Sequence, residues 1–167
     1  MNDPGLFDVI YNCRAMRRLE AREVPEDLLV KLIDAANQAP SGSNLQNAAW
    51  IVVRDAGIRK RLADLNRAGV TAYLGGERQR VDGLQHQSAD KRSRMLDAVE
   101  WQMEHMHEIP ALIVACMDFG VPVNDLMYAH GGGSVWPGIQ NLLLAARALG
   151  LGAAPTPLAL GNRAAVA

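Results

Sequence analysis

The sequence has 167 residues, 49% of them hydrophobic and 21% charged, which suits a single domain with one sizeable core. Its formal net charge of -1 argues against a broad surface for nucleic acid or acidic membranes. Residues 142–160 are apolar but interrupted by arginine, glycine and proline, and a membrane span needs about 20 mostly uncharged residues. Because no basic segment followed by an apolar core stands near the N-terminus, we expect a cytoplasmic protein without a secretory signal.

The N-terminal part predicts two helices. The Asp-Pro pair at residues 3–4 is typical of an N-cap and a first helical turn, and apolar residues at helical spacing continue to about Cys13 or Met16. A second helix opens at Pro25. It should stop before Pro40, because the residue that precedes a proline disfavours helical backbone angles.

The composition of the sequence changes after a predicted strand and a predicted helix. Residues 50–53 predict a strand and residues 55–67 a helix. Residues 69–94 are rich in Gly, Gln, Arg and Asp and have weak periodicity. We interpret them as a variable excursion, either mobile or a poorly packed helix pair, and as a candidate lid.

Regular patterns return in the C-terminal half. Residues 95–107 predict a helix, and the run ALIVACM at 111–117 is apolar throughout, as in a central strand covered by helices on both faces. Three glycines then lead into a helix over residues 134–149, closed by Gly150 in a typical position after the last turn. The order of elements predicts an α+β fold with helix in excess, as a single domain over residues 1–167.

Several common functional patterns are absent from the sequence. It has no GxGxxG after a strand, no GxxxxGK[ST] and no GxSxG. Cys13 and Cys116 form no CxxC pair, so we interpret them as buried, reduced thiols. His105 and His107 are two residues apart and would face different sides of a helix, so we predict no metal site.

The first polar feature is the arginine-rich stretch CRAMRRLEAR, which begins at Cys13. Arginines near a helix C-terminus often do no more than offset the macrodipole. They also bind phosphate oxygens in bidentate fashion. Arg14 and Arg18 are four residues apart and would project together if the turn stays helical, so a phosphate clamp is the alternative.

The second polar feature is APSGSNLQNAAW, residues 39–50, which has more hydrogen-bonding capacity than a connector needs. Backbone N–H groups of Ser41 and Gly42 and the amides of Asn44 and Gln46 could meet the edge of a planar, polar heterocycle. Glycine at position 42 permits either a close approach or a positive φ. The alternative is a helix-capping turn that satisfies the chain ends.

Both features, in this order and separation, resemble the nitroreductase family of FMN-dependent oxidoreductases. The resemblance covers nearly the whole chain and is carried by four segments: RAMRR (14–18), VPEDLLVKLIDAANQAPSGSNLQ (24–46), EIPALIVACMD (108–118) and GIQNLLLAARALGLGA (138–153). It implies a three-layer α-β-α fold of the α+β class that works as an intertwined homodimer, with FMN at the subunit interface.

The resemblance also implies which residues contact FMN, and it implies no catalytic side chain. The implied contacts are Arg14, Ala15, Met16 and Arg18 at the phosphate and ribityl chain, Asn44 and Gln46 at the ribityl and isoalloxazine groups, Pro40, Ser41 and Gly42 from the partner subunit, and Pro155 and Thr156 near flavin N5 and O4. Candidate substrate contacts, for which packing or exposure is the more ordinary explanation, are Tyr73, His86, Trp101 and His105.

The implied reaction belongs largely to the cofactor. NADPH or NADH gives hydride to flavin N5, and a nitroaromatic, quinone or activated alkene then takes the same place and is reduced. One open site serves both steps, which is consistent with the absence of GxGxxG. Two alternatives stay open: a flavin enzyme of this fold with another reaction, such as dehydrogenation or dehalogenation, and a non-catalytic flavin-binding protein.

The sequence departs from the family pattern in two places. After Gln46 it has Asn47 and Ala48 where the family commonly has Pro-Trp, and we expect Trp50 to take over part of the packing. The chain also ends at Ala167, whereas relatives usually continue for some tens of residues with a strand, a basic residue for the phosphate and an arm around the partner. The C-terminal part of the family fold is therefore expected to be missing, either because the sequence is a truncated form or because the protein is a shortened member. In a shortened member the two arginines of the clamp would have to hold the phosphate alone.

Overall fold

A computed structural model describes residues 4–82 and 86–161, and the chain divides into two compact units. The sheet unit comprises Met1–Ala15, Glu23–Val53 and Ala111–Ala154. The helix-pair unit comprises Met16–Arg22, Arg54–Pro110 and Pro155–Ala167. A single domain over the whole chain stays a prediction.

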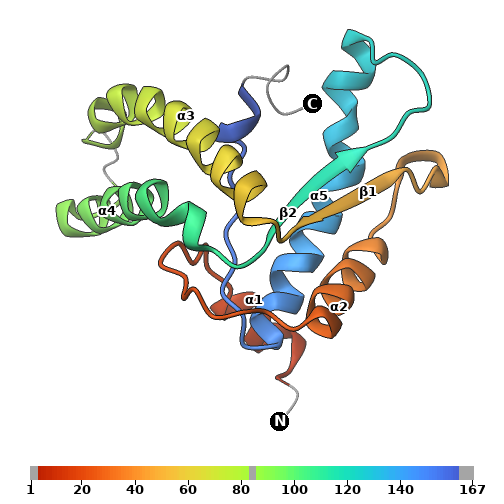
Figure 1. The fold of residues 1–167 in the computed structure, drawn as a ribbon, viewed down its shortest axis with the longest axis horizontal. Helices are drawn as coiled ribbons and strands as arrows, with labels where there is room; N and C mark the ends of the chain where they lie inside the picture. The colour runs from red at the N-terminus through yellow and green to blue at the C-terminus, as the bar shows by residue number, and fades with distance from the viewer. Residues whose placement is uncertain (1–3, 83–85, 162–167) are drawn as a thin grey trace. The chain divides into compact units, whose positions relative to one another are not determined.

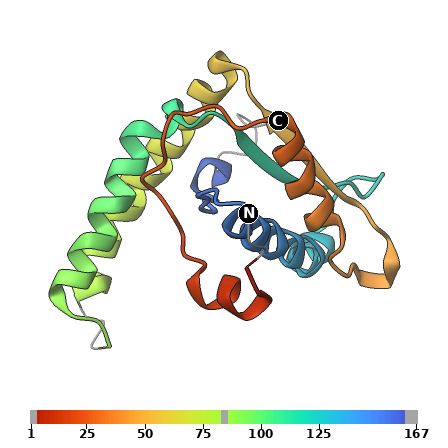
Figure 2. The ribbon, with the colours of Figure 1, turned by 90° about the horizontal axis from the view of Figure 1, so that it is seen from below.

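The sheet unit is built around two strands and two packed helices. Strands β1 (Ala48–Val53) and β2 (Leu112–Met117) pair antiparallel (Figure 1). Helices α2 (Glu26–Asn37) and α5 (Asp125–Ala148) lie side by side (Figure 2). Their contact forms the hydrophobic core of this unit, which consists of Leu32, Ala36, Leu142 and Ala146.

Trp50 closes one side of this core. Its ring packs against the core cluster, and its Nε1–H donates a hydrogen bond to Oδ1 of Asn37 at 2.8 Å. A Cβ atom on Gly138 would lie 3.0 Å from both the ring and the carbonyl oxygen of Ala36. Glycine at position 138 therefore lets α5 approach α2 and β1 closely, and Trp50 has the packing role expected for it.

The apolar run at residues 112–117 forms a strand as predicted, but it is not a central strand in the described part of the chain. All six residues of β2 are half-buried, and β1 is its one partner among residues 4–82 and 86–161. A central strand needs a neighbour on each edge, and the second edge of β2 has none there. The α+β class with helix in excess is confirmed, with a small sheet of two strands.

Some helix boundaries of the sheet unit agree with those predicted from the sequence, and others do not. Helix α1 (Leu6–Asn12) begins after Gly5, and the predicted cap at Asp3 lies outside the described residues. Helix α2 follows Pro25 and ends before Pro40 as predicted. Helix α5 begins well before the predicted start at residue 134, because the Asn124 side chain caps it by accepting a hydrogen bond from the Met127 N–H at 2.9 Å.

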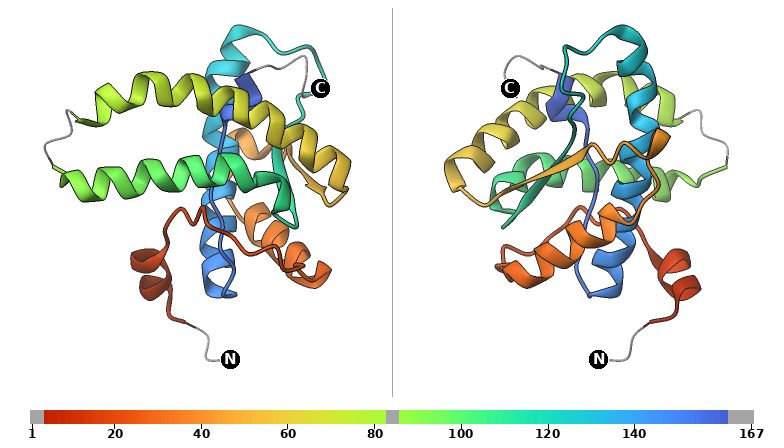
Figure 3. Two further views of the ribbon diagram at one scale, coloured as in Figure 1. Left: turned by 60° about the vertical axis from the view of Figure 1, so that its left-hand side comes forward. Right: turned by 90° about the vertical axis from the view of Figure 1, so that its right-hand side faces the viewer.

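The helix-pair unit contains two long helices and two short 3₁₀ turns. Helices α3 (Ala56–Asp82) and α4 (Ala89–His105) run side by side (Figure 3). The turns are η2 (Met106–Glu108), which continues α4, and η3 (Leu158–Gly161), which packs on α3. The helix predicted to end at residue 67 thus continues to Asp82, and the helix predicted from residue 95 begins at Ala89. Residues 69–82 and 89–94 therefore extend the two flanking helices, while the variable excursion and the lid stay predictions.

Two features fix η3 against α3. A Cβ atom on Gly69 would lie 2.3 Å from the carbonyl oxygen of Leu158, so a glycine is needed where the two backbones meet. Asn66, only 1% exposed, accepts a hydrogen bond through Oδ1 from the hydroxyl of Thr156 at 2.8 Å. The segment that carries Pro155 and Thr156 is therefore held by backbone contact and by a buried polar pair.

The remaining expectations concern the cysteines and membrane spans. Cys13 and Cys116 are free thiols, but each is half-buried, so the expectation of full burial is wrong. Partial burial still raises the pKa of the Cys116 thiol, because water is removed from around its charged form. Among the helices of the described residues, none is both long and apolar enough to cross a membrane.

Candidate functional site

The arginine-rich stretch leaves the helix before its first arginine. Helix α1 ends at Asn12, and Cys13 is already extended, with φ -68° and ψ 129°. Residues 13–17 have no regular secondary structure, so the condition for joint projection of Arg14 and Arg18, a turn that stays helical, is not met. The Cys13 N–H makes the last helical hydrogen bond, to the carbonyl of Val9, and the extended ψ of Cys13 then turns the chain out of the helix.

Arg14 caps the end of α1. Its Nη1 donates hydrogen bonds to the carbonyl oxygens of Tyr11 at 2.8 Å and Cys13 at 2.7 Å. These contacts match the more ordinary interpretation of the arginines, in which a cation offsets the negative end of a helix. The side chain is nevertheless exposed, and its Nε and Nη2 groups make no hydrogen bond to another described residue. Arg14 thus keeps donors for an anion.

The turn from Ser41 to Gln46 has unusual backbone geometry. Ser43, Asn44 and Gln46 have φ values of 53°, 55° and 49°, in the left-handed region that non-glycine residues rarely adopt. Gly42 lies outside that region, so the expectation of a positive φ at this glycine is not met, and the turn places it elsewhere. Three non-glycine residues with left-handed backbone angles in one short turn store backbone strain, which is typical of functional sites.

Hydrogen bonds inside the turn hold this geometry. The hydroxyl of Ser41 accepts from the Gln46 N–H at 3.0 Å, and the carbonyl of Ser41 accepts from the Asn44 N–H at 3.0 Å. Nε2 of Gln46 donates to Oδ1 of Asn44 at 3.0 Å. The structure thus brings the predicted contacts Ser41, Asn44 and Gln46 together, with the last two side chains exposed.

A residue that the sequence did not indicate ties this turn to helix α5. The N–H of Gly42 donates a hydrogen bond to the hydroxyl of Ser134 at 3.0 Å. The Gly42 Cα also comes close to this hydroxyl, since an added Cβ would lie 3.4 Å from it. A side chain of this size would fit there, so close approach of a ligand to Gly42 stays a prediction. A serine after three glycines was the one available signal for Ser134.

The other predicted contacts are distributed over both units. Ala15 is exposed in the sheet unit, and Pro40 is exposed at the end of the segment after α2. Met16 and Arg18 are exposed in the helix-pair unit. Thr156, also in that unit, is half-buried, and its hydroxyl is bound to the buried Asn66, a residue that the sequence did not mark as functional.

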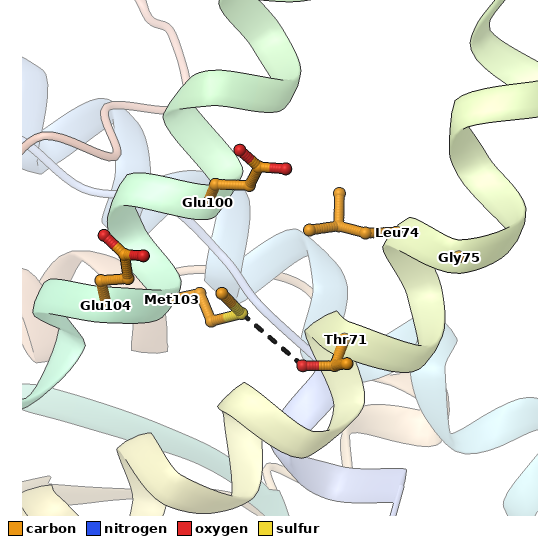
Figure 4. Close-up of a pocket in the computed structure, with 6 residues that line it drawn as sticks. All are labelled: Thr71, Leu74, Gly75, Glu100, Met103 and Glu104. Atoms are coloured by element: carbon orange, nitrogen blue, oxygen red, sulfur yellow. Dashed lines mark hydrogen bonds between the residues drawn. The ribbon is translucent and has the colours of Figure 1, made fainter.

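Two cavities lie away from these residues. One, of about 270 Å³, lies between α3 and α4, where Leu74 extends across from α3 and two carboxylates project from α4 (Figure 4). Its lining consists of Thr71, Leu74, Gly75, Glu100, Met103 and Glu104. The other, of about 330 Å³, lies between α1 and the end of α5 and includes Asp8 and Arg147. Neither of these two cavities contains a predicted flavin contact.

Local packing accounts for two of the candidate substrate contacts. The rings of Trp101 and His105 stack with centroids 4.2 Å apart and planes 6° apart. Nδ1 of His105 also hydrogen-bonds the carbonyl oxygen of Trp101 at 2.9 Å. Among the described residues, no group of three or more His, Cys, Asp or Glu side chains could hold a metal ion.

Comparison with known proteins matches the chain to distant relatives. It is 25% identical over 151 residues to the iodotyrosine deiodinase of Thermotoga neapolitana, which covers 90% of this chain and 72% of that protein. It is 26% identical over 154 residues to a proposed NADH dehydrogenase/NAD(P)H nitroreductase of Methanothermobacter thermautotrophicus, which covers 89% of this chain. The chain spans only 58% of the length of this second relative.

Solved structures and a family model agree with these matches. The crystal structure of an oxidised iodotyrosine deiodinase bound to FMN and 3-iodo-L-tyrosine superposes with a TM-score of 0.64 at 21% identity, covering 98% of this chain and 82% of that one. At this identity the likeness shows the fold. The model of the nitroreductase family matches residues 10–164, nearly the full length. The chain therefore belongs to the nitroreductase family.

Proposed function

We propose that this chain binds FMN at the interface of a homodimer and transfers hydride from NADPH or NADH, by way of flavin N5, to a nitroaromatic, quinone or activated alkene. The observation that carries the proposal is the turn from Ser41 to Gln46. The left-handed backbone of three residues destabilises the folded chain, and a turn that only connects two elements does not need such a conformation. Family membership and the FMN in the deiodinase structure support flavin as the ligand.

The chemistry of the side chains fits FMN. A phosphate needs cationic, multidentate donors, and the exposed guanidinium groups of Arg14 and Arg18 provide them. The edge of an isoalloxazine ring presents both donors and acceptors, and the exposed amides of Asn44 and Gln46 offer both. No aspartate or glutamate stands in the segments 14–18 or 40–46, where it would repel the phosphate.

Bound FMN would supply the two-electron chemistry, and the side chains of the site bind and orient it. In the proposal the arginines hold the phosphate, while the turn fixes the ring by hydrogen bonds from a backbone whose geometry is already set. In the same proposal Pro155 and Thr156 would contact the ring near N5 and O4. The hydrogen bond from Thr156 to the buried Asn66 would hold the segment of Pro155 and Thr156 in place while the nicotinamide leaves and the acceptor enters.

A homodimer is supported by the surface of α1. Leu6, Phe7, Ile10 and Tyr11 are all exposed, three of them to more than 60%. The rings of Phe7 and Tyr11 stack with centroids 6.1 Å apart, which makes one continuous apolar surface. Monomeric proteins rarely leave such a surface in water, so a second subunit is the proposed cover.

Reductive dehalogenation is the second candidate, because the deiodinases of the comparison match about nine-tenths of the chain or more. The two reactions differ in the acceptor that reoxidises the flavin. A protein that oxidises NADPH with a quinone but leaves 3-iodo-L-tyrosine intact supports the first proposal. Release of iodide from 3-iodo-L-tyrosine by the reduced protein supports the second.

The absorption spectrum of the purified protein with added FMN, before and after NADPH without oxygen, tests the proposal. We expect a bound yellow flavin that bleaches with NADPH and returns when a quinone is added. A protein that stays colourless after FMN addition and gel filtration would overturn the proposal. Flavin that binds but is not reduced by either nicotinamide would point to the non-catalytic alternative.

A further inference from the structure

We propose that Ser134 is the positioning residue of the flavin-binding turn, acting through the N–H of Gly42. This inference rests on the proposed function. The hydroxyl of Ser134 does not act on FMN itself. It fixes where the turn from Ser41 to Gln46 stands on the sheet unit, and hence where Asn44 and Gln46 present their amides.

The internal hydrogen bonds of the turn cannot fix its position on the sheet unit. Those from Gln46 and Asn44 to Ser41, from Leu45 to Gly42, and between the side chains of Gln46 and Asn44 all close within residues 41–46. They define the shape of the turn but leave its position open. Among the hydrogen bonds described for this turn, the one from Gly42 to Ser134 is the only one that reaches beyond residue 46.

The other end of this hydrogen bond is on a well-fixed element. Helix α5 contributes Leu142 and Ala146 to the core of the sheet unit, and its Gly138 packs directly against Trp50 and the backbone of α2. Ser134 stands one turn before this contact. A helix packed in this way gives its side chains a defined position, as the outer support of a binding site requires.

Backbone strain makes the external hydrogen bond important. Left-handed Ser43 and Gln46 lie in a conformation that costs each of them free energy, so a turn without an anchor outside itself can relax away from this placement. A ligand that binds one placement of the turn binds more weakly in proportion to the time spent in the others. Ser134 raises the population of the competent placement before FMN arrives.

Three variants test this role: Ser134→Ala removes the hydroxyl, Ser134→Thr retains it, and Asn124→Ala removes the cap of the same helix. FMN affinity is measured by quenching of flavin fluorescence, and folding by thermal unfolding. Ser134→Ala should weaken FMN binding about five- to tenfold, as expected for one lost hydrogen bond, while Ser134→Thr stays within about twofold of the original. Asn124→Ala should lower the unfolding temperature and leave FMN affinity unchanged.

Hydrogen exchange of the ligand-free protein gives a second readout. The Gly42 amide should exchange several-fold faster in Ser134→Ala, with the amides of α5 unaffected. Unchanged FMN affinity in a folded Ser134→Ala protein would overturn the role of Ser134 alone. An equal loss of affinity in Asn124→Ala would also overturn it, because general stability of α5 would then explain the effect. A wild-type protein that does not bind FMN would instead overturn the proposed function, and this inference with it.

Discussion

The sheet unit and the helix-pair unit both bury apolar side chains, but the helix-pair unit also buries polar ones. Where α2 crosses α5, the sheet unit buries Ala36, Leu142 and Ala146, which are small or branched and wholly apolar. Where η3 meets α3, the helix-pair unit buries the amide of Asn66 beside a glycine. The first contact depends on volume, so it should respond to changes in size. The second adds a hydrogen bond and a close backbone contact to its apolar packing, so it should also respond to loss of a polar partner or to a single added methyl group.

The largest effect is expected in the apolar core of the sheet unit. Leu32→Ala should destabilise the protein by about 2–5 kcal/mol, since Leu32 is buried in the cluster and the alanine leaves a cavity. Val30→Ala on the same helix is the control, because Val30 is 59% exposed and should change stability by no more than about 0.5 kcal/mol. Denaturant unfolding measures both. Similar losses in the two variants would show that volume does not govern this contact.

The next effect separates two glycines of α3. Gly69→Ala should cost about 1–3 kcal/mol, because the added Cβ collides with the backbone of Leu158 and η3 has to move. Gly76→Ala should stabilise by about 0.5–1 kcal/mol, because no atom lies within 4 Å of its added Cβ and alanine is the better helix former. Opposite signs of the two changes in unfolding free energy are the prediction. A stabilised Gly69→Ala variant would mean that η3 does not pack on α3 in solution.

The helix that carries both glycines also shows where the length of a helix cannot be predicted from local sequence patterns. Helix α2 has apolar residues at regular spacing between two prolines, and the sequence predicted its extent closely. Helix α3 continues through Gly75 and Gly76, which weaken any local helix signal. Val70 and Leu74 are buried, and α3 packs on α4 and η3, two elements distant from it in the sequence. Long-range packing of this kind cannot be read from the local pattern.

The candidate site was predicted to a similar, partial extent. The sequence marked the polar turn and Arg14 because their residue types are chemically conspicuous, and their contact with FMN stays a prediction. The conformation was not predictable, since three residues other than glycine adopt the positive φ and Gly42 does not. Ser134 and Asn66 were missed for another reason. Each acts through one hydrogen bond to a residue about 90 positions away, and neither leaves a pattern in its own segment.

The buried polar pair gives the third effect. Thr156→Val should destabilise by about 1–3 kcal/mol, because it keeps the shape of threonine but leaves Oδ1 of the buried Asn66 without its donor. Thr156→Ser retains the hydroxyl and is the matched control. We expect the valine variant to bind FMN more weakly as well, because Thr156 belongs to the proposed site. Equal unfolding free energies for the valine and serine variants would contradict the assigned hydrogen bond.

The smallest effect concerns the surface of α3, where charge rather than burial acts. A hydrogen bond from the Lys60 ammonium to Asp64 at 2.8 Å lowers the pKa of that carboxyl below its usual value. A lowered pKa in the folded state adds stability at pH values above the unfolded pKa, and that stability is lost as the pH falls through the folded pKa. Both side chains are largely exposed, so water and salt screen the pair and the gain is slight. Lys60→Met should raise the pKa of Asp64 toward its usual value, as measured by NMR titration of the carboxyl carbon. Because the ammonium is an exposed surface charge, we expect high salt to shift the pKa of Asp64 in the same direction in the original protein, and a titration insensitive to both changes would show that the pair does not form in solution.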